Sequence, residues 1–265
     1  MTDFENSIKR EMTKDKYEKI RDHVYSDKED FKHFSYGKVA SWFTWNRKKN
    51  GQIANVHPPI PDLTQKGHYY DGPISQWDGD KLPAEHRFSS RITTRIVFLG
   101  LNMSGEGEPG KLPIFQNARG HKRVVRTFFG TKAEGGYFTD IIKPDQRILD
   151  NVENPSEAEQ VTAYLNRNPK VLNDHIQIFT DELKFIEAEN PLLIVFGKHA
   201  EWAVTTALDM DSLNKRKFHA IVYTMHYAAY PQGGDEGYMG IVRKDLARYI
   251  TIPAFDNNFP DNMGR

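Results

Sequence analysis

Apolar and polar positions in the second half of the chain form four blocks, each an apolar run that leads into a loop. Residues 96–99 are apolar at every position, which predicts a strand that is buried on both faces. Residues 135–144, 191–203 and 218–230 show the same pattern, a β-rich run followed by a turn or a helix start. In open α/β sheets, ligands bind where strands end. The residues expected at these strand ends are Asn102, Asp140, His199 and His226.

The N-terminal third has a different organisation. Residues 3–36 are rich in charge and predict one or two solvent-exposed helices. Residues 50–90 contain five prolines and several glycines, which indicates loops and turns, and nearby aromatic side chains suggest that this segment packs on the core. We therefore expect an extension over residues 1–90, an α/β domain over 91–253 and a tail over 254–265.

Composition sets limits on the function. The 36 basic and 36 acidic residues balance, so any DNA-binding surface must be a local patch. The chain has no cysteine, which excludes disulfides, thiolate nucleophiles and cysteine-ligated zinc, and its ten histidines lack metal-ligand spacing. We expect no metal and no cofactor. Without a long apolar run, and with a polar N-terminus, we expect a cytoplasmic monomer that makes no membrane contact.

A glycine-rich loop after the first strand offers one nucleotide-binding alternative. Residues 105–110, GEGEPG, match the dinucleotide fingerprint G-x-G-x-x-G. However, Glu106 and Glu108 would face a pyrophosphate, and Pro109 interrupts the helix start that should bind it. A Rossmann-type enzyme therefore stays open only as an alternative.

Four segments together resemble the uracil-DNA glycosylase superfamily. GLNMS at 100–104 is similar to that family's loop after the first core strand, and HYAAY at 226–230 to its His-containing last loop. Phe115 follows Asn102 at the spacing of the family's base-stacking aromatic. YFTDIIK and NPLLIVFGKHA resemble the two intervening strands, so the resemblance covers roughly residues 92–250 in the family's order.

The resemblance implies a fold and a reaction. The fold is α/β, a three-layer αβα sandwich around a central, mostly parallel four-stranded sheet. The reaction is hydrolysis of the N-glycosidic bond of a flipped-out uracil or modified, cytosine-type base in DNA, for repair or for defence against modified phage DNA. Three alternatives remain: a weakly catalytic DNA-binding protein on the same fold, the Rossmann-type enzyme, and an enzyme for free nucleosides or RNA.

The resemblance also assigns roles to residues. Asn102 would orient the attacking water, and His226 would donate a hydrogen bond to the departing base. Phe115 would stack on the extruded base, and Asp140 would read its edge. Further base-binding residues are expected at Gly100, Leu101 and Ser104.

Departures from the family pattern bear on the substrate. Met103 and Tyr227 stand where members often have proline, and no cysteines are present for the iron-sulfur cluster of one branch. Asn102 replaces the aspartate of the fast uracil enzymes, and Asp140 replaces the asparagine that reads uracil. An ionised carboxylate only accepts hydrogen bonds, which favours a cytosine-type base. The opposite interpretation is that Asp140 points away and caps a turn.

Two segments are candidates for holding DNA. The run HKRVVRTFFGTK supplies Lys122, Arg123 and Arg126 as phosphate contacts, although a helix with a basic outer face would look the same. The loop after His226 offers aromatic and apolar side chains as wedges into the DNA. These side chains are Tyr227, Tyr230, Tyr238 and Met239.

Overall fold

The structure is a computed structural model. It describes residues 1–10, 12–26, 28–31, 35–36, 40–43, 88–102 and 121–255. The strands are β1 (Ala40–Trp42), β2 (Thr93–Asn102), β3 (Gly136–Ile142), β4 (Leu192–Phe196) and β5 (Ala220–Thr224). The helices are α1 (Asp3–Ser7), α2 (Lys14–Asp22), α4 (Phe88–Arg91), α5 (His121–Phe128), α6 (Gln146–Asn151), α7 (Ala158–Arg167), α8 (Pro169–Phe185), α9 (Lys198–Asp209) and α10 (Gly234–Leu246), with a 3-10 turn, η2, at Lys215–Lys217.

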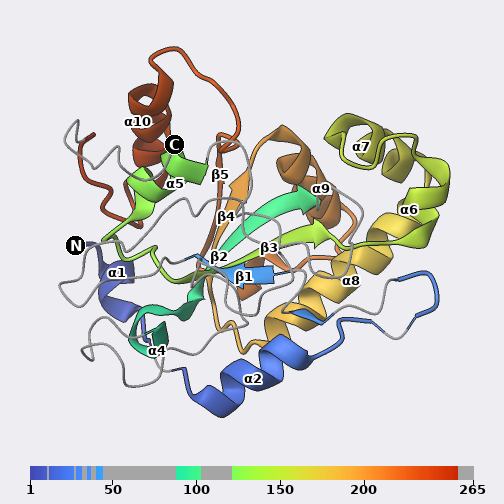
Figure 1. Ribbon diagram of the computed structural model, residues 1–265, viewed down its shortest axis with the longest axis horizontal. Helices are drawn as coiled ribbons and strands as arrows, with labels where there is room; N and C mark the ends of the chain where they lie inside the picture. The colour runs from blue at the N-terminus through green and yellow to red at the C-terminus, as the bar shows by residue number, and fades with distance from the viewer. Residues whose placement is uncertain are drawn as a thin grey trace, which may run out of the picture.

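The strands form one five-stranded sheet in the order β1-β3-β2-β4-β5 (Figure 1). The strands β3, β2, β4 and β5 all run parallel, which confirms the predicted α/β class and its central parallel sheet. β1 joins the edge of β3 in the antiparallel sense and was not predicted. The connection from β2 leads to β3 on one side, and the connection from the neighbouring β4 leads to β5 on the other side. Such a switch point is where open sheets bind ligands.

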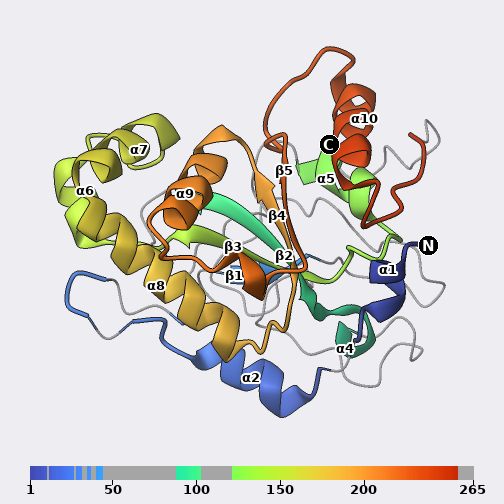
Figure 2. The same ribbon diagram turned by 180° about the vertical axis from the view of Figure 1, so that it is seen from behind.

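Helices cover both faces of the sheet because neighbouring residues of its buried strands point to opposite sides. On β2, Val97 and Leu99 join the apolar cluster that includes α8 and α9, whereas Ile96 and Phe98 join the cluster of α5 and α10. Figures 1 and 2 show these two groups of helices on opposite sides of the strands. All four side chains are fully buried, as the apolar run predicted.

The described part of the N-terminal extension is built into both clusters. Phe4 of α1 is buried with α5 and α10, and Tyr17 and Ile20 of α2 are buried with α8. Thr2 caps the N-terminus of α1 in a capping box, and its hydroxyl donates to the Tyr249 carbonyl at 2.6 Å. Residues 44–87 lie outside the described residues, and they include most of the Pro/Gly-rich stretch at 50–90.

A buried polar network fastens β3 to α8. Lys143 Nζ lies 2.7 Å from Glu182 Oε2, and both side chains are completely inaccessible to solvent. Glu182 Oε1 accepts hydrogen bonds of 2.9 Å from the hydroxyls of Tyr137 and Thr139, and the Lys143 ammonium also donates to Thr139. Every charge in this network therefore has a partner, as burial in an apolar layer demands.

Candidate functional site

A cavity of about 1010 Å³ opens at the carboxyl ends of the four parallel strands. Each of these strands contributes to its wall: Gly100 and Leu101 from β2, Asp140 from β3, Phe196 from β4 and Thr224 from β5. His199, at the start of α9, and His226, after β5, add two imidazoles to the lining. The structure thus brings together Gly100, Leu101, Asp140, His199, His226 and Tyr227, which are far apart in sequence.

Asp140 lies on β3 directly opposite Gly100 of β2. A Cβ atom at Gly100 would overlap with Asp140 Oδ1, so only glycine lets the carboxyl lie across the neighbouring strand. The side chain is buried, and its Oδ2 makes no hydrogen bond within the described part of the chain. Burial raises the pKa of Asp140 to about 7, against the opposing effect of Lys143. At neutral pH this carboxyl can therefore either donate or accept a hydrogen bond.

The interpretation that Asp140 caps a turn does not fit this placement. The cap belongs to Asp145, whose Oδ1 accepts from the Arg147 N–H at 2.7 Å at the start of α6. Burial raises the pKa of Asp145, but hydrogen bonds from His175 and Arg147 outweigh it and bring the pKa below its usual value. Asp140 instead lines the cavity, and its Oδ2 accepts no hydrogen bond from the residues that the structure describes.

His226 reaches the cavity because Gly197 leaves room for it. Gly197 has a φ of 82°, and a Cβ atom there would lie 2.8 Å from the Cβ of His226. The Ala228 N–H donates to His226 Nδ1 at 3.2 Å, so Nδ1 is the acceptor and the neutral ring carries its proton on Nε2. Burial, followed by the charge of a protonated His199, lowers the pKa of His226. The ring is therefore a neutral donor at neutral pH.

His199 carries its proton on the other nitrogen. Thr162 of α7 donates its only hydroxyl proton to the Ala158 carbonyl at 2.6 Å, so its oxygen must accept from His199 Nδ1, 3.1 Å away. That leaves Nε2 of a neutral His199 with a lone pair that accepts no hydrogen bond from the described part of the chain. Burial and then Lys198 lower the pKa of His199, which favours the neutral ring.

Arg123, predicted as a phosphate contact, faces the protein instead. Its side chain is 5% exposed, and Nε donates to Asp235 Oδ1 at 2.8 Å. Its guanidinium also donates to the carbonyls of Tyr227 and Ala229 and lies 4.6 Å from the Tyr230 ring centroid. Arg123 thereby joins the loop after His226 to α5 and α10. The prediction that it contacts DNA is wrong.

The aromatic side chains of this loop divide into buried and exposed ones. Tyr227 is buried and stacks on the His226 ring, with centroids 4.2 Å apart. Tyr238 and Met239 lie on the buried face of α10, so the expectation that they and the buried Tyr227 act as wedges into DNA is wrong. Tyr230 is 66% exposed, and it stays a candidate for stacking on DNA.

The remaining predicted residues are only partly described. The backbone of Asn102 ends β2 and pairs in register with Ile142, which places it beside the cavity. Arg126 lies 3.2 Å from Asp235 and is 16% exposed. Ser104, Phe115 and the fingerprint loop at 105–110 lie outside the described residues, as does the side chain of Lys122.

Three lining residues of the cavity with lysine or carboxylate side chains were not predicted. Lys198 and Glu201 come from the first turn of α9, and Asp245 of α10 accepts from the Thr224 hydroxyl at 2.8 Å. His199, expected after the end of a strand, lies in the first turn of α9 and had been given no role in the site. Its place directly after the turn that ends β4 was the signal available in the sequence.

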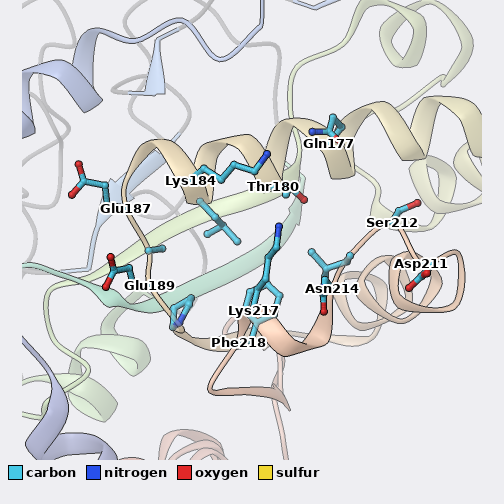
Figure 3. Close-up of a pocket in the computed structure, with 14 residues that line it drawn as sticks. Gln177, Thr180, Lys184, Glu187, Glu189, Asp211, Ser212, Asn214, Lys217 and Phe218 are labelled. Atoms are coloured by element: carbon cyan, nitrogen blue, oxygen red, sulfur yellow. The ribbon is translucent and has the colours of Figure 1, made fainter.

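A second cavity, of about 540 Å³, lies at the opposite edge of the sheet (Figure 3). It is bounded by the end of α8, the segment before β4, the end of α9 and η2, and it contains lysines and carboxylates together. Figure 3 shows Lys217 extending from η2 toward α8. Lys184 on α8 is paired with Asp181 at 2.7 Å. None of the strands that the structure describes presents its carboxyl end here, so this cavity lacks the convergence seen at the first.

Within the described residues, no group of three or more histidine or acidic side chains is arranged to hold a metal ion. In the same part of the chain, no helix combines the length and the apolar character that crossing a bilayer requires. Comparison of the sequence and structure with protein-family models, curated proteins and solved structures finds no match.

Proposed function

We propose that the protein is a DNA glycosylase that hydrolyses the N-glycosidic bond of a flipped-out base. One observation carries the proposal: a buried carboxyl, Asp140, and a neutral imidazole donor, His226, line one cavity at the switch point of the sheet. Two motifs that resemble the uracil-DNA glycosylase superfamily contribute to the lining of this cavity: Gly100 and Leu101 from the motif that begins at the end of β2, and His226 from the motif that follows β5.

The arrangement suits cleavage of a bond to a nucleobase. As that bond breaks, negative charge grows on the departing base, and a fixed N–H donor stabilises it without reorganisation. His226 Nε2–H is such a donor, because Ala228 occupies the other nitrogen and Gly197 fixes the place of the ring. The cavity is large enough for a base that has left the duplex stack.

Incubating the protein with oligonucleotides that carry a panel of bases tests the proposal. We expect one or more bases to be released, leaving abasic sites that alkali cleaves. Binding to abasic or mismatched DNA without base release would support the non-catalytic alternative instead. Tight binding of a dinucleotide, with no base release, would favour the Rossmann-type alternative.

Asp140 gives a pH-dependent prediction for base preference. Below about pH 7 its protonated carboxyl can donate to the uracil carbonyl, whereas above that pH it only accepts, which suits the exocyclic amine of a cytosine-type base. We expect the ratio of cytosine-type to uracil release to rise as pH increases through about 7. Asp140→Asn should shift preference toward uracil and flatten this dependence, measured as single-turnover rates on both substrates.

The stability of Asp140→Asn provides the control. Between pH 4 and 7, native Asp140 holds a proton that the unfolded chain has lost, so this group makes the native state less stable as pH rises. The amide cannot ionise, so the variant should resist urea at least as well as the wild type at pH 8. A base preference that is unchanged in a folded variant, and independent of pH, would show that Asp140 does not read the base.

A further inference from the structure

Two histidines line the same cavity with their protons on opposite nitrogens. His226 must be protonated on Nε2, because the Ala228 N–H occupies Nδ1. His199 must be protonated on Nδ1, because the Thr162 hydroxyl donates its hydrogen bond to the Ala158 carbonyl and can only accept from the ring. The cavity therefore contains one imidazole that can donate from Nε2 and one that can accept there.

We propose that His199 is the general base of the hydrolysis, the group that takes a proton from the attacking water. The assignment rests on the proposed glycosylase function and adds to it a residue that the sequence resemblance does not provide. An asparagine at 102 cannot accept a proton at neutral pH, so the reaction needs a base from elsewhere. His199 fits because its lone pair is free and its orientation is fixed by a second helix, α7.

The proton and electron transfers balance with these two groups. A water oxygen forms a bond to the sugar C1′, and the electron pair of the N-glycosidic bond leaves with the base. His199 Nε2 takes one proton from the water, while His226 Nε2–H hydrogen-bonds the anionic base. The base then gains a proton from solvent, and His199 returns its proton to solvent. The products are a free base and an abasic sugar with a hydroxyl at C1′.

The charges around His199 are mixed. On α9 itself Lys198 and Glu201 flank the ring position, and Glu159 of α7 acts on it through space. His226, Asp140 and Asp245 share the cavity from the other elements. Lys198 favours the neutral ring and Glu159 the charged ring, so the base form is retained without a carboxylate pair.

His199→Asn is the decisive variant. Asparagine places its amide nitrogen at the Nδ1 position, so it can still donate to Thr162, but it has no group at the Nε2 position. We expect its single-turnover rate of base release to fall at least about tenfold, with unchanged affinity for abasic DNA. The wild-type rate should decline as acid protonates His199, and the variant should lose that decline.

Two variants of Thr162 test the orientation. Thr162→Ser keeps the hydroxyl and should behave as the wild type, whereas Thr162→Val removes the acceptor for Nδ1–H and should slow base release. Nitrogen-15 NMR of the histidine rings reads the protonated nitrogen directly and does not depend on activity. The expected pattern is Nδ1–H on His199 and Nε2–H on His226.

The outcomes separate the two proposals. If the wild type releases bases and His199→Asn matches it in rate and pH profile, the inference about His199 is wrong and the glycosylase proposal stands. A proton on Nε2 of His199 also overturns the inference by itself. If the wild type releases no base from any oligonucleotide, both proposals fail together.

Discussion

Replacing Lys143 with Met is expected to lower the free energy of unfolding by about 3 to 5 kcal/mol. The substitution leaves Glu182 with an uncompensated charge in a completely buried site, because Lys143 is the cation 2.7 Å from its Oε2. The hydroxyls of Tyr137 and Thr139 still donate to the other oxygen, but they cannot neutralise the charge. Urea denaturation followed by circular dichroism measures the loss.

A second substitution serves as the matched control. Adding Glu182→Gln to Lys143→Met removes the stranded charge but keeps an oxygen that can accept from the two hydroxyls. We expect the double variant to recover a large part of the lost stability. If the free energy of unfolding of Lys143→Met lies within about 1 kcal/mol of the wild-type value, the pair is not buried in solution.

Replacing His226 with Ala is expected to slow base release by about 100- to 1000-fold, the effect of losing one fixed donor to a developing anion. Tyr227 stacks on the imidazole, so folding of the variant is checked by its thermal unfolding. His226→Gln is the matched variant, because its amide nitrogen lies near the Nε2 position and should restore part of the rate. Base release at the wild-type rate from folded His226→Ala would rule out the assigned role.

The central sheet could be predicted because its inner strands are buried on both faces and carry their signal locally. The run at 96–99 is apolar throughout and β4 is buried at every position, whereas β5, at the edge of the sheet, is only partly buried but is still marked by a β-rich run. β1 could not be predicted, since three residues carry no usable periodicity and the strand exists only through its pairing with β3. The α10 helix was missed although Tyr238, Met239, Val242 and Leu246 have helical spacing.

The site was predictable where the residue type and the strand end coincide. Asp140 and His226 each lie at the end of a β-rich run, and the parallel topology brings such ends together. The prediction that Arg123 contacts phosphate was wrong because its partner, Asp235, lies 112 residues away. Local sequence cannot distinguish a buried ion pair from a basic surface. The proton positions of the two histidines depend on single hydrogen bonds from other segments, so only the structure reveals them.

The edge strand β1 has a consequence for how the chain is synthesised and folds. Its partner residues on β3 lie about 100 positions later, and non-local pairing of this kind forms slowly. During translation, β1 must therefore remain without its partner until β2 and β3 have been made. Once paired, Ala40–Trp42 covers the outer edge of β3, where an unpaired strand would otherwise be open to other chains.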